Sequence, residues 1–159
     1  TEDYELFGKK VKILSPEMEF ISMCLHHYKD MNSIYLLSLG NISLEHFFDI
    51  FFYLKNVKMS MSKLIRLTDI FSAKPYIYYC LWHTNHILDE PMITKLLPIF
   101  KTTLGVNLIS SFGLSSNERY PWEIDFFDRL FSDEFKKEFN KTLNIQQQDK
   151  IQINSRFIR

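Results

Sequence analysis

Three side chains that could ligate a metal recur at three-residue steps in the middle of the chain: Cys80, His83 and His86. On a helix, such steps place side chains on one broad face, and a thiolate with two imidazoles suits zinc. Asp89 stands one step further on and could supply a fourth ligand. A single helix, however, lacks the ligand pairs of structural zinc motifs. We therefore favour a buried cysteine and two helix-surface histidines, and keep zinc as the weaker alternative.

A second group of polar residues interrupts two strongly apolar segments. His26 and His27 are adjacent in the first segment, and Asp49 lies in the second, inside the apolar run of residues 47–52 and three residues after His46. This setting predicts that Asp49 is buried, and a buried carboxylate must be paired or hydrogen-bonded. A histidine of the first segment is a reasonable partner, so the question is whether Asp49 reaches His26. We favour a structural link between two packed helices over a catalytic pair.

Motifs that cradle phosphates or hold magnesium are missing from the sequence. The chain has 4 glycines, and neither a phosphate-binding loop nor a dinucleotide-binding spacing can be written with them. Neither Gly-x-Ser-x-Gly nor His-Glu-x-x-His occurs. The nearest match to a metal-binding Asp-x-Asp pair is Glu123-x-Asp125, which is typical of acids in a first helical turn. The sequence therefore predicts no phosphoryl-transfer centre in these residues.

Composition limits the class of protein and its partners. The 159 residues carry 19 basic and 19 acidic side chains, so the formal net charge is zero. A nucleic-acid partner is disfavoured, because long phosphate backbones are usually met by a basic surface. Hydrophobic residues make up 46% of the chain and include 15 Phe, 8 Tyr and 2 Trp. We expect one domain, or one domain with part of another, whose core is filled by large aromatic side chains.

Cysteine use and hydropathy predict a cytoplasmic protein without a membrane segment. Cys24 and Cys80 lie far apart in apolar stretches and are typical of buried thiols, which fits a reducing compartment. Residues 1–12 are polar and charged, so no signal peptide is expected there. The longest apolar run covers only residues 76–82, whereas a membrane-spanning helix needs about 20 apolar residues.

The elements that must position these side chains are mostly helices. Two β-prone runs, residues 4–7 and 11–14, flank residues 8–10 and predict a short hairpin. Ser15-Pro16-Glu17 is a strong helix start, because it offers an N-cap, a first-turn proline and an acid near the positive helix end. Helices are expected over residues 16–30, 34–39, 44–56, 63–71, 76–89 and 92–103, and residues 122–143 are expected to form one helix or a helix pair.

Several of these helices carry more detailed expectations. The helix over residues 44–56 is apolar almost all round and should be central, covered on most sides. Ser60 or Ser62 should cap the next helix, and Pro98 should bend or split the helix over residues 92–103. Residues 114–121 are expected to form a loop, and Ser132 offers a second N-cap within the last helix.

The predicted fold is mainly α: an irregular bundle of six or seven helices preceded by a short β-hairpin. Its parts are the hairpin (residues 1–14), a helical domain (residues 15–143) and a polar tail (residues 144–159). Within the tail, residues 151–154 alternate between apolar and polar and could form an edge strand.

Three short motifs resemble the C-terminal half of the uncharacterised nucleotidyltransferase family, which is related to the DNA polymerase β-like nucleotidyltransferases. They are Val11-Lys12-Ile13-Leu14-Ser15-Pro16-Glu17, Cys24-Leu25-His26-His27-Tyr28-Lys29 and Phe47-Phe48-Asp49-Ile50-Phe51-Phe52-Tyr53-Leu54. His26 and Asp49 fall at the family's histidine and aspartate positions. The resemblance covers residues 6–90 best, with a weaker match at residues 127–131.

The resemblance implies transfer of a nucleoside monophosphate from a nucleoside triphosphate to a hydroxyl or similar acceptor, with two Mg²⁺ ions held by carboxylates. In the family, those carboxylates and a Gly-Ser turn lie in an N-terminal α/β domain that this sequence does not contain. It is therefore either a C-terminal helical part, for substrate binding or as a lid, or a degenerate relative, and is inactive alone. His26, Lys29 and Asp49 would then support the domain interface or an acceptor pocket, and none is expected to be catalytic.

Two other functions remain open at this point. The chain could be a stand-alone helical interaction module, which would expose a contiguous apolar patch. It could also be a metal-dependent helical enzyme that uses His26, His46, Asp49, His83 or His86, which we rank last. Under the nucleotidyltransferase hypothesis, the expected partners are an upstream catalytic domain and a small-molecule or protein acceptor. No membrane partner is expected.

Overall fold

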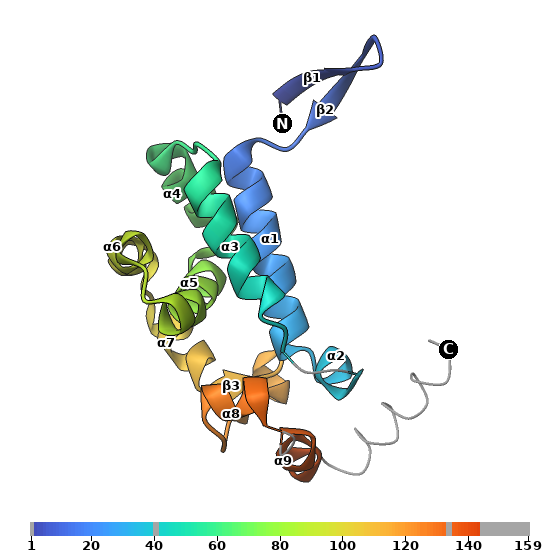
Figure 1. The fold of residues 1–159 in the computed structure, drawn as a ribbon, viewed down its shortest axis with the longest axis vertical. Helices are drawn as coiled ribbons and strands as arrows, with labels where there is room; N and C mark the ends of the chain where they lie inside the picture. The colour runs from blue at the N-terminus through green and yellow to red at the C-terminus, as the bar shows by residue number, and fades with distance from the viewer. Residues whose placement is uncertain (1, 40–41, 133–134, 144–159) are drawn as a thin grey trace. The chain divides into compact units, whose positions relative to one another are not determined.

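The computed structural model describes residues 2–39, 42–132 and 135–143, and these are mainly helical (Figure 1). The helices within them are α1 (Pro16–Asn32), α2 (Ile34–Leu39), α3 (Glu45–Asn56), α4 (Met61–Ile70), α5 (Lys74–Leu88), α6 (Pro91–Phe100), α7 (Thr103–Ile109), α8 (Phe126–Phe131) and α9 (Phe135–Thr142). The strands are β1 (Glu2–Leu6), β2 (Lys9–Ile13), β3 (Ser111–Phe112) and β4 (Tyr120–Pro121). The predicted class, a helical bundle after a short β-hairpin, is confirmed, with more and shorter helices than expected.

The N-terminal hairpin forms as its turn residues predict. β1 and β2 pair antiparallel, with Tyr4 opposite Val11. The turn places Phe7 at φ 50° and Gly8 at φ 74°. Glycine suits position 8, because a side chain there would strain the left-handed backbone. Most of the hairpin side chains are exposed, among them Tyr4, Leu6 and Phe7.

The chain divides into two compact units. One consists of the described residues within 1–28 and 45–109, and the other of those within 29–44 and 110–159. The boundary falls inside α1, which runs as one unbroken helix from Pro16 to Asn32. Each unit has its own buried side chains.

The central helix of the first unit is α5. The sequence predicts instead that the helix over residues 44–56, which corresponds to α3, is central. The buried positions of α5 are Ile77, Tyr78, Tyr79, Cys80, Leu81, His83 and Thr84. In α3, by contrast, Phe47 and Ile50 are buried while Phe48 and Phe52 are exposed. The expectation of a covered α3 was wrong, because apolar composition does not guarantee that every face meets another helix.

The predicted break in the sixth helix falls later than Pro98. This proline stays inside α6, and the chain turns at Lys101, whose backbone is extended. The Thr102 hydroxyl then accepts a hydrogen bond from the Gly105 N–H at 2.9 Å and begins α7. Gly105 itself permits a close approach, since an added Cβ would lie 2.9 Å from Cδ1 of Tyr78 in α5.

The second unit is built around a short strand pair and small helices. β3 and β4 pair antiparallel, with Phe112 opposite Tyr120, so part of the expected loop over residues 114–121 is ordered as a strand. The last helix does not begin at Trp122 as expected. Asp125 caps α8 by accepting a hydrogen bond from the Phe127 N–H at 2.8 Å, so α8 begins at Phe126.

Two remaining expectations concern the C-terminal part. Ser132 is the C-cap of α8, and its expected role as an N-cap involves residues 133–134, which lie outside the described residues. The suggested edge strand at residues 151–154 lies outside the described residues. Among the residues that are described, no helix combines the length and the apolar character needed to cross a lipid bilayer.

Candidate functional site

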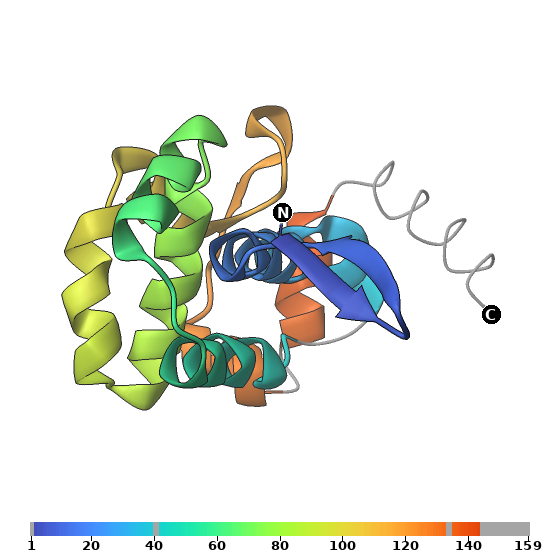
Figure 2. The same ribbon diagram turned by 90° about the horizontal axis from the view of Figure 1, so that it is seen from above.

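Helices α1 and α3 lie antiparallel and make side-chain contacts with each other near both ends. Figure 2 shows both helices nearly end-on, side by side. At the start of α1, the Tyr53 hydroxyl of α3 donates to the carbonyl oxygen of Pro16 at 2.9 Å and lies 2.8 Å from Oε2 of Glu19. Burial, together with the Glu19 carboxylate, raises the pKa of Tyr53, so its hydroxyl stays protonated and donates. This end is a structural clamp.

At the other end of the pair, two histidines and an aspartate meet. His27 of α1 is 7% exposed, and its Nε2 lies 3.5 Å from Oδ2 of Asp49 in α3. The ring of His46, also in α3, stands perpendicular to the His27 ring, with centroids 4.8 Å apart. The predicted link between the two apolar segments therefore exists, and its histidine is His27.

The expectation that Asp49 is buried was wrong. Its side chain is 61% exposed, although it stands among phenylalanines in the sequence. The open face of α3 explains this, because Phe48 beside it is exposed as well. Asp49 is therefore open to solvent, and its position next to the buried His27 ring is the informative feature.

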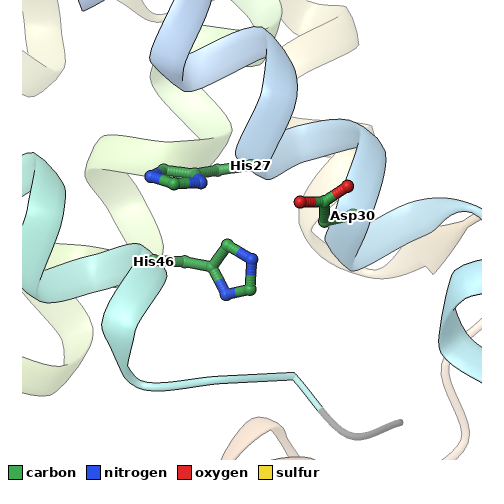
Figure 3. Close-up of side chains that lie close together, drawn as sticks. All are labelled: His27, Asp30 and His46. Atoms are coloured by element: carbon green, nitrogen blue, oxygen red, sulfur yellow. The ribbon is translucent and has the colours of Figure 1, made fainter. Parts of the chain in front are cut away.

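Asp30 extends this group along α1. It lies on the same helix, one turn after His27. One ligand atom each from His27, Asp30 and His46 lie within 4.8 Å of one another. Figure 3 shows the two imidazoles and the carboxylate gathered at the junction of α1 and α3. We refer to His27, Asp30 and His46 as the histidine–aspartate cluster.

The three residues singled out by the family resemblance are all exposed: His26, Lys29 and Asp49. Of these, Asp49 is the one that borders the histidine–aspartate cluster. Sequence reasoning missed His27 as the buried histidine and Asp30 as its neighbour. The available signal was spacing, since His27 falls seven residues after Phe20, on the stripe that α1 buries.

The residues of the proposed zinc motif on α5 do not converge. Cys80 and His83 are fully buried, whereas His86 is exposed and stacks on Trp82 with ring centroids 4.8 Å apart. The ring of His83 packs edge-on against Tyr79 at 4.4 Å. Within the described residues, the histidine–aspartate cluster is the one group of three such ligand atoms this close together. The geometry thus favours the structural interpretation of α5.

The two cysteines are neighbours in the core of the first unit. Both are free thiols and both are buried, and Sγ of Cys80 donates to the carbonyl oxygen of Cys24 at 3.3 Å. Burial raises the pKa of Cys24 well above its usual value, and the adjacent Cys80 thiol adds to this. The prediction of two buried thiols is confirmed, and the raised pKa makes the Cys24 thiol a poor nucleophile at neutral pH.

The Ser15-Pro16-Glu17 motif is a buried joint between α1 and α4. Oε1 of Glu17 accepts from the Ser60 N–H at 2.9 Å, and Oε2 lies 2.8 Å from Nζ of Lys63. Burial by itself raises the pKa of Glu17. The Lys63 ammonium, the N–H groups of Ser60 and Glu17 and the Ser15 hydroxyl together outweigh it and lower the pKa to about 2. Ser60 is also the N-cap of α4, as the sequence suggested.

A separate open pocket of about 440 Å³ lies where α6 passes into α7. It is lined by Lys101, Thr102, Thr103, Val106 and Asn107. This lining contains one cation and neutral polar groups but no carboxylate or histidine. It therefore offers no acid–base pair.

Comparisons with known proteins give no match for this chain. No protein-family model matches it, and neither the search of curated proteins nor that of solved structures gives a significant match.

Proposed function

We propose that this chain is the helical, substrate-binding or lid part of a nucleotidyltransferase that transfers a nucleoside monophosphate from a nucleoside triphosphate to a hydroxyl or similar acceptor. The observation that carries the proposal is the contact between two of its motifs. Asp49, from the motif at residues 47–54, lies 3.5 Å from His27, in the motif at residues 24–29. Motifs that are distant in sequence but adjacent in space are what a shared interface or pocket requires.

Exposed apolar side chains support an additional domain as the partner. Phe7 at the hairpin turn is 95% exposed, and Leu6 beside it is exposed too. A two-stranded hairpin is marginal alone and gains stability from a neighbouring sheet. On α3, Phe48 and Phe52 stack on each other at an exposed position, with ring centroids 6.3 Å apart. In the proposal, an upstream α/β catalytic domain covers these surfaces.

The Mg²⁺ ions and the nucleotide would be held by that upstream domain. The described residues of this chain do not fit them, because their ligand cluster contains two imidazoles, whereas Mg²⁺ prefers carboxylate and phosphate oxygens. The described part of the chain contributes the exposed residues His26, Lys29 and Asp49 to the domain interface or the acceptor pocket. None of the three acts as a catalytic residue in the proposal.

The acceptor is a small molecule or a protein, and the whole enzyme works in the cytoplasm. The net charge of zero supports an acceptor other than a polynucleotide. The two free, buried thiols support a reducing compartment.

The proposal is tested on the complete product of the reading frame that encodes this chain. We expect a Gly-Ser turn and an Asp-x-Asp pair upstream of residue 1. We also expect transfer of labelled nucleoside monophosphate by the complete protein with Mg²⁺, and none by the 159 residues alone. Asp49→Asn should lower kcat/KM by about 10-fold, which corresponds to a loss of about 1.4 kcal/mol of transition-state stabilisation. The matched control is Glu45→Gln, which changes an exposed acid at the start of the same helix.

Two results would overturn the proposal. One is a stop codon directly upstream of residue 1 with no catalytic segment elsewhere in the reading frame. The other is a complete protein that carries the upstream motifs and transfers no nucleotide from any of the four nucleoside triphosphates.

The same exposed side chains favour a second candidate, a stand-alone helical interaction module. Phe7, Phe48 and Phe52 would then contact a partner protein. Light scattering after size-exclusion chromatography separates the candidates, since a module that self-associates elutes as a dimer or larger species. A monomer that becomes active only with the upstream domain supports the nucleotidyltransferase part.

A further inference from the structure

We propose that the histidine–aspartate cluster of His27, Asp30 and His46 is a binding site for a divalent transition metal, with Zn²⁺ as the ion its donors suit best. The inference is independent of the proposed nucleotidyl transfer. It concerns imidazole ligands at the junction of α1 and α3, not the carboxylate-bound Mg²⁺ of an upstream domain.

The donor set is the first argument. Two imidazoles and one carboxylate are borderline ligands that suit zinc and its neighbours in the transition series. Three protein ligands leave one position of a tetrahedral zinc open for water or a substrate group, which is the arrangement of catalytic zinc sites. A purely structural zinc site would instead use four protein ligands.

The spacing of the ligand atoms is the second argument. They lie within 4.8 Å of one another. In a tetrahedral site with bonds of about 2.0 Å, ligand atoms are about 3.3 Å apart. Small side-chain rotations close that difference, because His46 and Asp30 are only half-buried and can move. His27 and Asp30 are on consecutive turns of one helix, a spacing that points two ligands to the same side.

The third argument is that Asp49 contacts one of the proposed ligands, His27. Its Oδ2 lies 3.5 Å from Nε2 of His27. A metal-bound histidine usually donates its other ring N–H to a carboxylate, which fixes the ring and strengthens it as a ligand. With Nε2 of His27 directed at Asp49, Nδ1 is the nitrogen that serves the metal.

Burial around His27 is the fourth argument. The His27 ring is almost entirely enclosed, while Asp30 and His46 are partly accessible. The cluster thus has one firmly packed ligand and an accessible side through which an ion can enter. A bare pairing of histidine and aspartate would serve a structural role equally well, so the experiment must measure the metal itself.

The test is a calorimetric titration, in which Zn²⁺ alone is added to the chelator-treated 159-residue chain. We expect one equivalent to bind with a micromolar or lower Kd, and Co²⁺ in its place to give visible absorption bands typical of tetrahedral coordination. His46→Gln and Asp30→Asn should each weaken Zn²⁺ binding by more than about 100-fold, since even the loss of a residue that only supports a ligand costs about 10- to 100-fold. Asp49→Asn should weaken binding within that smaller range, because Asp49 contacts the ligand His27 and not the metal.

The control variant is His26→Gln, which removes the exposed histidine adjacent to His27 on the same helix and should leave the Zn²⁺ affinity unchanged. We avoid a large change at His27, because it is buried and its loss would affect folding. Circular dichroism confirms that each variant keeps its helices before it is scored. The proposal is overturned if the folded wild-type chain binds no stoichiometric Zn²⁺. It is also overturned if His46→Gln and Asp30→Asn bind as tightly as His26→Gln.

Failure of this proposal is distinguishable from failure of the proposed function. Zinc binding is measured on the isolated chain, whereas nucleotidyl transfer needs the complete protein. A chain that binds no zinc can still belong to an active nucleotidyltransferase, and a zinc-binding chain can belong to an inactive one.

Discussion

The carboxylate of Glu17 accepts a hydrogen bond from the backbone N–H of Ser60 at 2.9 Å, which ties the first turn of α1 to the start of α4. The Lys63 ammonium, 2.8 Å from the other carboxylate oxygen, completes the joint. Glu17 is thus ionised although it is buried. Its partners Ser60 and Lys63 both lie at the start of α4. Its contribution to stability can be measured in two independent ways.

Replacing Glu17 by Gln should destabilise the fold. The amide keeps the shape but removes the charge that faces Lys63 and Ser60. The lowering of the Glu17 pKa from 4.5 to about 2 corresponds to roughly 3 kcal/mol of unfolding free energy at neutral pH. Urea denaturation measures the loss. Glu45→Gln, an exposed first-turn acid of α3, is the matched control and should cost at most about 1 kcal/mol. Equal losses in the two variants would contradict the role of Glu17.

The same carboxylate predicts how stability depends on pH. Because its pKa is lower in the folded than in the unfolded chain, the unfolded state binds the proton first as the pH falls. The contribution of Glu17 is therefore complete above about pH 4.5 and is lost as the pH approaches 2. The difference in unfolding free energy between wild type and Glu17→Gln should shrink over that range in acid titrations. A difference that stays constant down to about pH 3 would show that Glu17 is not the titrating group.

Gly105→Ala tests the close packing of α7 on α5. An added Cβ would lie 2.9 Å from Cδ1 of Tyr78 and 3.2 Å from the carbonyl oxygen of Pro75. The strain should lower the unfolding free energy by about 1–3 kcal/mol, although alanine normally favours a helix over glycine. Thermal unfolding provides the measurement, with Val106→Ala, an exposed neighbour on α7, as the control. A stabilised Gly105→Ala protein would contradict the packing.

The two thiols should react only when the chain unfolds. Cys24 and Cys80 are buried, and burial raises the pKa of Cys24, so little thiolate reaches solvent. Labelling with iodoacetamide, followed by mass spectrometry, should be slow in buffer and fast in urea. Ser116→Cys adds an exposed thiol as an internal reference, which should be labelled quickly under both conditions. Native labelling of Cys24 at the rate of that reference would refute the buried arrangement.

Part of the candidate site was accessible to sequence reasoning. The apolar segments around residues 26 and 49 were expected to join through a histidine and Asp49, and a contact between His27 and Asp49 is present. Neighbouring residue types do not show which of the two adjacent histidines is buried, and the spacing of seven residues from Phe20 was the signal that favoured His27. The face of α1 that is covered depends on α3 and α5, and these helices are brought to it by long-range packing.

The sequence by itself determined the local features of this protein. Ser60 caps α4, Pro91 opens α6, and Gly8 forms the hairpin turn, because each choice depends on backbone chemistry within a few residues. The tertiary structure decided the rest: α5 instead of α3 is the covered helix, Asp49 is exposed, and Asp30 joins the two histidines. The physical reason is that burial depends on which helices meet, and periodicity in one helix carries no information about its partners.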